Sequence, residues 1–191
     1  IELPLQPELQ SQKTELPRMN IQAIALNGIP LYGATEGNGH NAVQVDQDSL
    51  IKDAAFWYGH AARNGDWHYH APIFGSEAQD HAEETLLGFA LDGFKIYGPV
   101  ANPDDVLDNC NGRVNSNTGE YQYHVRTPDQ VPTGADDYCD GNNPWTNWNY
   151  ILGCYSGDAS ATKMSSDTFW GDIPDDCQED DELNALAADP S

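Results

Sequence analysis

Apolar and polar residues alternate over short stretches of the chain, which is the pattern of half-buried β-strands. Turn residues bound the stretches that show it: 20–33, 67–70, 93–99 and 120–126. A further stretch, 80–91, begins with helix-forming residues, but Gly88 predicts a strand at its end. Residues 47–57 predict a short helix. The pattern therefore predicts a mainly β, or β-rich α+β, fold with long loops.

The two ends of the chain differ in composition from the middle. Residues 1–18 hold several prolines and glutamines without a period, which predicts an extended N-terminal arm. Residues 19–177 are expected to form a single domain, whose part beyond Cys139 is an irregular cap. Residues 178–191 are acidic and then alanine-rich, and we interpret them as a solvated tail.

Two segments of the chain occur twice, in the same order. Residues 27–33 match 92–98, and the Gly-rich and aromatic pattern of 59–70 matches 112–124. We therefore predict a duplicated strand-turn-strand unit. Neither copy alone would bury its apolar face well, so we expect the copies to pack around a pseudo-twofold axis.

The histidines all lie between positions 40 and 124, and two of them stand two residues apart. In a strand, residues two apart point to the same face, so His68 and His70 can share one metal ion. Trp67 and Tyr69 then face the opposite side and pack in the core. The bland alternative is that the histidines are hydrogen-bonded neighbours of core aromatic residues.

Other histidines extend this candidate site. His124 is the repeat partner of His70, and we expect it to approach the same ion across the pseudo-twofold axis. His60, in a glycine-flanked loop, is the further candidate ligand. His40 and His81 read as solvent-facing, and we leave them out of the ligand set.

Four cysteines stand at wide, uneven spacing: Cys110, Cys139, Cys154 and Cys177. The lack of a Cys-x-x-Cys pair weighs against a zinc knuckle and a thioredoxin-type motif. The even number predicts two disulfides in an oxidising compartment, bracing the C-terminal cap. Three pairings are possible, and we favour Cys110–Cys139 with Cys154–Cys177. The alternative is buried free thiols.

The donor atoms narrow the choice of metal. Imidazole nitrogens suit zinc, copper and nickel, and cysteines used in disulfides leave no thiolate site. We take copper as the first choice and zinc as the alternative. Calcium is a separate candidate for the acidic loops at 102–105 and 136–143, although neither has EF-hand spacing and both also fit solvated turns.

The charge balance excludes several classes of partner. Asp and Glu number 31 against 8 Lys and Arg, giving a formal net charge of −23. Nucleic acids and anionic lipids require a cationic surface, so we exclude them. No apolar run is long enough to predict a membrane-spanning helix. The chain starts at Ile1 rather than Met, which we interpret as a mature form with its leader removed.

Enzyme motifs are missing: the sequence has no Gly-x-Ser-x-Gly elbow, no phosphate-binding loop and no dinucleotide fingerprint. Late aromatic residues offer a possible stacking platform for sugar rings, although core packing is the commoner use of such residues. They are Trp145, Trp148, Tyr150, Tyr155 and Trp170.

Six motifs follow one another along the chain, at 27–30, 59–60, 67–70, 91–99, 107–112 and 121–124. Taken together, they resemble the YHYH-domain family over about residues 20–141. The family's Tyr-His-Tyr-His motif here reads Trp-His-Tyr-His. Its members are typically exported, so the resemblance implies export. Arg113 and Gln122 depart from the fuller histidine pattern, which favours a single site centred on the first repeat.

The leading hypothesis is a secreted or periplasmic protein that binds copper for storage, scavenging or delivery. Its ligands would be His68, His70 and His124, with His60 as the fourth. The second hypothesis is a copper-dependent oxidoreductase that uses the same site. The third is an extracellular carbohydrate-associated or surface binding module in which the histidines are structural.

Overall fold

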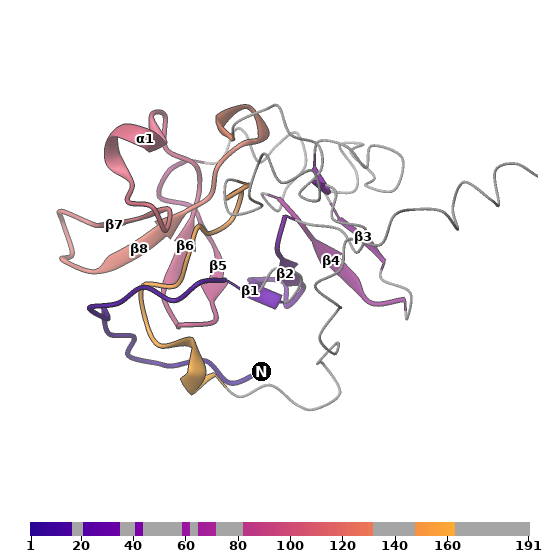
Figure 1. Cartoon of the computed structure of the whole chain (residues 1–191), viewed down its shortest axis with the longest axis horizontal. Helices are drawn as coiled ribbons and strands as arrows, with labels where there is room; N and C mark the ends of the chain where they lie inside the picture. The colour runs from indigo at the N-terminus through magenta and orange to yellow at the C-terminus, as the bar shows by residue number, and fades with distance from the viewer. Residues whose placement is uncertain are drawn as a thin grey trace, which may run out of the picture.

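The computed structural model describes residues 1–16, 21–34, 41–43, 59–61, 65–71, 82–131 and 148–162. Within these ranges eight strands form one mixed sheet, in the order β3-β4-β2-β1-β5-β6-β8-β7 (Figure 1). The strands are β1 (Ile21–Ala25), β2 (Pro30–Tyr32), β3 (Gly59–Ala61), β4 (Trp67–Tyr69), β5 (Leu86–Ala90), β6 (Lys95–Tyr97), β7 (Gly112–Val114) and β8 (Tyr121–His124). The described helical turns are α1 (Pro103–Val106), η2 (Pro128–Gln130) and η5 (Ala159–Ala161). The prediction of a mainly β fold is confirmed.

Two hairpins of one kind occupy the centre of the sheet. In the first, between β1 and β2, Gly28 donates its N–H to the carbonyl of Ala25 at 2.9 Å and has a φ of +84°. In the second, between β5 and β6, Gly93 donates to Ala90 at 2.9 Å with a φ of +91°. Both turns require a positive φ, which glycine adopts without a steric penalty. Strands β1 and β5 pair antiparallel and join the hairpins.

The sheet continues outward from each hairpin by the same pairings. Strand β2 pairs parallel with β4, and β4 pairs antiparallel with β3. Strand β6 pairs parallel with β8, and β8 pairs antiparallel with β7. The β3–β4 and β7–β8 pairs therefore lie at opposite ends of the described sheet (Figure 1).

The strands were largely predictable, with two exceptions. Strands lie within all of the stretches predicted to contain them. The helix-like start of 80–91 is wrong for the residues described there, because Thr85 donates to the carbonyl of Ala82 in a turn. Strands β3 and β7 were not predicted. The predicted helix at 47–57 and the tail at 178–191 lie outside the described residues.

Aromatic side chains from both ends of the sheet contribute to the core. Tyr69 on β4 is 1% exposed and Tyr123 on β8 is fully buried, together with Leu31 and Ile96 on neighbouring strands. Trp67 is partly buried and packs against the same core. The predicted inward placement of Tyr69 is confirmed. No helix in the described ranges is long and apolar enough to cross a membrane.

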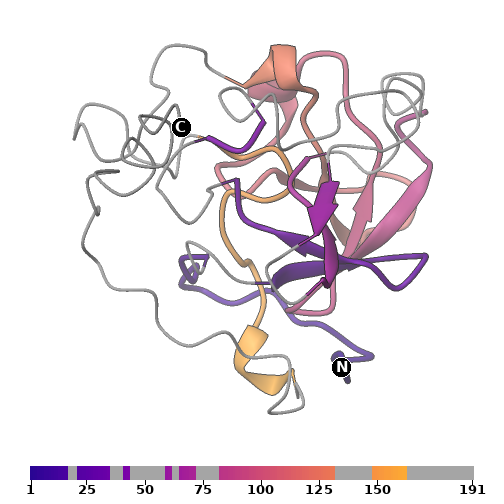
Figure 2. The ribbon, with the colours of Figure 1, turned by 90° about the vertical axis from the view of Figure 1, so that its right-hand side faces the viewer.

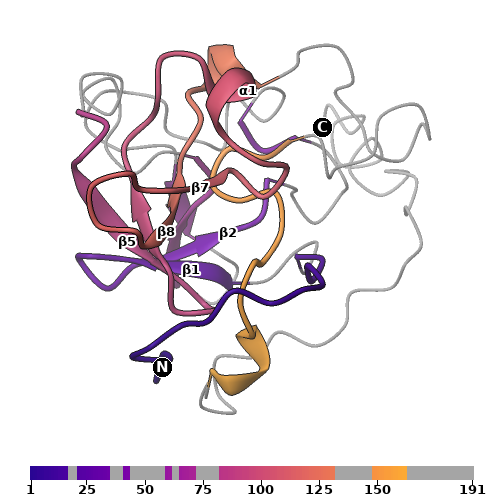
Figure 3. The same cartoon turned by 90° about the vertical axis from the view of Figure 1, so that its left-hand side faces the viewer.

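The segment 148–162 runs beside the N-terminal arm, as Figures 2 and 3 show in orange and indigo. Thr14 and Tyr155 exchange backbone hydrogen bonds of 3.0 and 2.8 Å, which tie the two segments together. Trp148, Tyr150 and Tyr155 are all buried. These three residues therefore belong to the core and present no ring to a sugar, while Trp145 and Trp170 lie outside the described residues.

A disulfide joins Cys110 to Cys154. The sequential pairings, Cys110–Cys139 and Cys154–Cys177, are therefore wrong. The reason lies in the path of the chain: the segment 148–162 returns to the loop before β7, where Gly153 donates its N–H to the carbonyl of Cys110 at 3.2 Å. Cys139 and Cys177 lie outside the described residues.

Candidate metal centre

Strand pairing brings three histidines to one face of the sheet. His60 on β3 lies directly opposite His68 on β4, so their side chains point the same way. His70 follows β4 directly and stands two residues after His68, which places it on the same face. We call His60, His68 and His70 the histidine cluster.

The ring nitrogens of the histidine cluster converge. The Nε2 atom of His70 lies 3.0 Å from that of His68 and 3.1 Å from that of His60. One ligand atom from each residue lies within 4.8 Å of the others, so the three can hold a metal ion. His68 and His70 are buried and His60 is half-buried. The expectation that His68 and His70 point together is confirmed.

Backbone carbonyls fix the tautomer of two of these rings. His70 donates its Nδ1–H to the carbonyl of Gly33 at 2.5 Å, and His68 donates its Nδ1–H to that of Asp66 at 3.4 Å. A neutral imidazole with its proton on Nδ1 has only a lone pair on Nε2. The Nε2 atoms of His68 and His70 therefore present lone pairs to each other, and a shared cation relieves that repulsion. This second-sphere carbonyl contact is also typical of metal-bound histidines.

Burial keeps both of these imidazoles neutral. Loss of solvent and, as a smaller cause, the neighbouring His60 lower the pKa of His68 to about 4. Burial also lowers the pKa of His70 to about 3, with a second contribution from His68. Metal ions bind the neutral imidazole, so near pH 7 these two residues need not lose a proton before they bind.

The imidazole donors and the distances between their Nε2 atoms suit a transition metal of intermediate softness. Metal–nitrogen bonds of about 2.0–2.1 Å in a tetrahedral site separate the ligand nitrogens by about 3.3 Å. The observed 3.0 and 3.1 Å are within a few tenths of an ångström of that value. Imidazole nitrogens fit zinc, copper and nickel, whereas calcium takes oxygen ligands.

A tyrosine that the sequence did not point to covers the cluster. Tyr32 on β2 stacks on His68, with ring centroids 4.2 Å apart and an interplanar angle of 26°. It also meets His70 edge-on at 6.3 Å. The repeated segment 27–33 ends in Tyr32 and Gly33, so the repeat was the signal that could have identified both as neighbours of the site.

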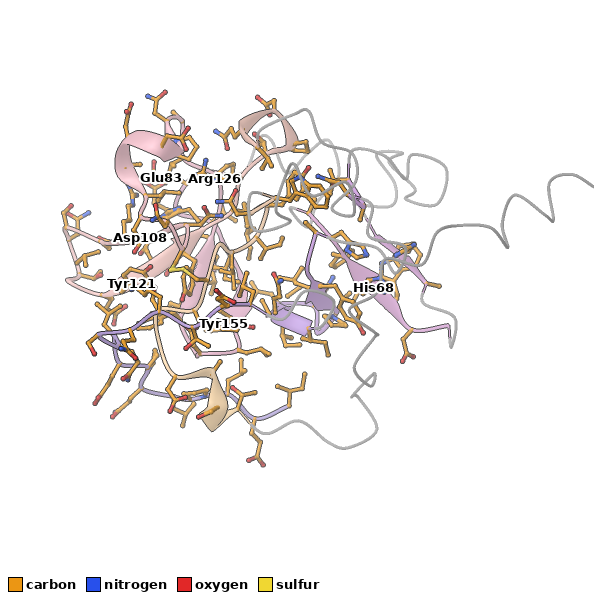
Figure 4. All side chains as sticks on the ribbon, in the orientation of Figure 1. His68, Glu83, Asp108, Tyr121, Arg126 and Tyr155 are labelled. Carbon is orange, nitrogen blue, oxygen red and sulfur yellow. A yellow bond between two sulfur atoms is a disulfide. The ribbon has the colours of Figure 1, made fainter. Side chains whose placement is uncertain are left out.

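The structure does not bring His124 to the histidine cluster. Four strands separate β4 from β8, a distance of about 24 Å at the usual spacing of about 4.8 Å between strands. In Figure 4, His68 lies at one end of the sheet and Arg126, two residues beyond His124, near the other. His124 is therefore not a ligand of the same ion, and His60 takes the third ligand position. His40 and His81 lie outside the described residues.

The acidic loops give no second centre in the part of the chain that the structure describes. Among the described residues, the histidine cluster is the one group of three or more potential metal ligands whose donor atoms lie close together. The predicted loop 102–105 mostly forms α1 instead, and its Asp104 is exposed and forms an ion pair of 2.7 Å with Arg126. The loop 136–143 lies outside the described residues.

Comparison with known proteins adds the family. The family model described as "YHYH protein" matches residues 1–167, most of the chain. No curated protein and no solved structure matches this chain. Within the matched range, the Trp-His-Tyr-His segment at 67–70 supplies two members of the histidine cluster, and the preceding strand supplies the third. The chain belongs to the YHYH protein family.

Proposed function

We propose that this protein binds one transition-metal ion through His60, His68 and His70. The observation that carries the proposal is the approach of three Nε2 atoms at 3.0 and 3.1 Å on one sheet face. Two of the rings have their Nδ1 atoms bound to backbone carbonyls, so their Nε2 lone pairs face a common point. Burial holds the same two rings in the neutral form that a metal requires.

Copper is our first choice of ion, with zinc as the alternative. Copper binds nitrogen ligands more tightly than the other divalent first-row metals do. The Cys110–Cys154 disulfide fits an oxidising compartment, and so supports a secreted or periplasmic protein. In that setting the protein stores, scavenges or delivers copper.

Elemental analysis of protein purified without a His-tag tests the proposal. We expect about one equivalent of copper or zinc in the wild type after reconstitution and dialysis. The His68→Ala/His70→Ala variant should lose it, because two of the three nitrogen ligands are removed. An electron paramagnetic resonance spectrum with nitrogen hyperfine structure would identify Cu²⁺ bound to imidazoles, whereas Zn²⁺ gives no signal.

The matched control is His124→Ala, which removes a buried histidine from the far end of the sheet. We expect it to retain the metal. A wild type without metal above background, even after reconstitution, would refute the proposal. Retention of the metal by the His68→Ala/His70→Ala variant would move the site elsewhere.

A second candidate function is a copper-dependent oxidoreductase at the same centre. The described ligand set counts three imidazoles, and His60 is only half-buried. An ion held by three side chains keeps a further position for water or substrate, as catalytic zinc sites do. Oxygen consumption by the copper-loaded protein with ascorbate distinguishes the two. Turnover well above that of the His68→Ala/His70→Ala variant favours the enzyme, and its absence favours storage or delivery.

We also propose that β1–β4 and β5–β8 are copies of one unit, related by a pseudo-twofold axis. The pairing of β1 with β5 supports this, because Ala23 faces Ala90 and Ala25 faces Gly88 about a central pair. In the repeat that aligns Gly28 with Gly93, Ala23 corresponds to Gly88 and Ala25 corresponds to Ala90. The axis would pass between β1 and β5.

A further inference from the structure

The proposed duplication gives the histidine cluster a counterpart at the other end of the sheet. Arg113 on β7 lies directly opposite Gln122 on β8, as His60 lies opposite His68. The corresponding positions are His60 with Arg113, His68 with Gln122, and His70 with His124. We call Arg113, Gln122 and His124 the second-half triad.

His124 is held in the same way as its counterpart. It is fully buried and donates its Nδ1–H to the carbonyl of Gly98 at 2.8 Å. Gly98 ends the repeated segment as Gly33 does, and Gly33 accepts the same hydrogen bond from His70. The Nε2 atom of His124 therefore presents a lone pair to its own triad, as a metal ligand would.

The chain itself satisfies that lone pair. Gln122 donates an Nε2–H to the Nε2 atom of His124 at 2.8 Å. Asn115 donates to the Oε1 atom of Gln122 at 3.0 Å, which orients the amide. An amide N–H thus occupies the direction from which an ion would approach.

Arg113 places a side-chain cation at the third position of the triad. The guanidinium of Arg113 forms an ion pair with Glu83, which is labelled in Figure 4. The Nε atom of Arg113 is buried and has no hydrogen-bond partner in the described part of the chain. A buried donor without a partner is uncommon in native proteins, so this guanidinium is only partly satisfied where it lies.

We infer that the second-half triad is a latent transition-metal site, which Arg113 and Gln122 fill with a guanidinium and an amide in place of an ion. The inference takes from the proposed function the premise that this frame of three side chains binds metal when all three are imidazoles. The two residues then determine that the protein binds one ion rather than two.

The Arg113→His/Gln122→His variant tests the inference by metal stoichiometry with Cu²⁺ or Zn²⁺ alone. We expect two equivalents against one in the wild type. In the His68→Ala/His70→Ala background the same variant should bind one equivalent, and a further His124→Ala change should abolish it. This background separates the two proposals, because it reports on the second half whether or not the histidine cluster binds metal.

The matched control is Arg113→Ala/Gln122→Ala, which removes the same charge and amide without adding imidazoles and should gain no metal. A folded Arg113→His/Gln122→His variant that binds no more metal than wild type would overturn the inference. Adding Glu83→Gln removes the carboxylate left without its partner, in case the charge impairs folding. If both variants fail to fold, the frame does not accept imidazoles and the inference is equally wrong.

Discussion

At the scale of single residues, His68 and His70 link the proposed metal centre to the stability of the fold. Each is buried, and burial lowers both pKa values far below the ordinary value of 6.5. In the unfolded chain both rings are hydrated and titrate near that ordinary value. The unfolded state therefore binds more protons than the folded state whenever the pH lies between the two sets of pKa values. In that interval the free energy of unfolding decreases as the pH is lowered.

We expect the metal-free protein to lose stability as the pH falls from about 6.5 towards 4, where the unfolded rings are protonated and the folded rings are not. Urea unfolding at half-unit pH steps in the presence of a chelator measures the effect. Saturating metal should oppose it, since ligand at 100 times its dissociation constant adds about 2.7 kcal/mol to the free energy of unfolding.

A His68→Gln/His70→Gln variant serves as the reference for this measurement, because carboxyl groups elsewhere also titrate at low pH. The variant should show a shallower decline than the wild type over the same interval. Parallel curves for the two proteins would contradict the assignment of the effect to these imidazoles.

At the scale of elements, local pattern predicted the hairpins but not every strand that forms the site. Period-two alternation and the turn glycines Gly28 and Gly93 are properties of adjacent residues. Strand β3 spans only three residues, and its pairing with β4 depends on register across the sheet. Local pattern therefore favours His124 over His60 as a ligand, because the repeat suggests a proximity for His124 that the strand order rules out for one shared ion.

The disulfide also depends on an arrangement that sequence spacing does not encode. Cys110 and Cys154 are 44 residues apart, and they meet because the segment 148–162 packs against the loop before β7. A crosslink that closes a loop of this length limits the unfolded ensemble and stabilises the fold by about 2–5 kcal/mol.

We expect the Cys110→Ala/Cys154→Ala variant to lose about 2–5 kcal/mol of unfolding free energy while keeping the metal stoichiometry of the wild type. Denaturant unfolding and elemental analysis give the two readouts. Peptide mapping of the wild type under non-reducing conditions should recover the Cys110–Cys154 pair. A change of stability within about 0.5 kcal/mol would mean that the crosslink contributes little.

At the scale of the whole molecule, the dominant electrostatic feature is the net charge of −23. Like charges spread over a small protein repel one another, and this repulsion weakens the compact state relative to the unfolded chain. Salt shortens the screening length from about 30 Å at 0.01 M to about 3 Å at 1 M. Composition alone predicts this property, since it depends little on which face each carboxylate occupies.

We expect the melting temperature of the metal-free protein to rise by several degrees between 10 mM and 0.5 M NaCl, because about 1 kcal/mol corresponds to about 2–4 °C at this size. Differential scanning calorimetry in the presence of a chelator measures the shift. Sucrose at matched osmolality is a control for effects other than screening. A melting temperature that falls or stays constant with NaCl would show that the charges are not limiting.

The position of the proposed metal centre at one end of the described sheet also bears on how fast an ion could leave. Strands β3 and β4 have three residues each, and β4 is joined to β2 through a single register pair, Leu31 with Tyr69. Short terminal strands open at a lower free energy than the centre of a sheet. Separation of β3 from β4 would part His60 from His68 while the central hairpins and the disulfide stay in place. Ion exchange would then follow the kinetics of this local opening, so that a bound metal could pass to an acceptor without unfolding of the protein.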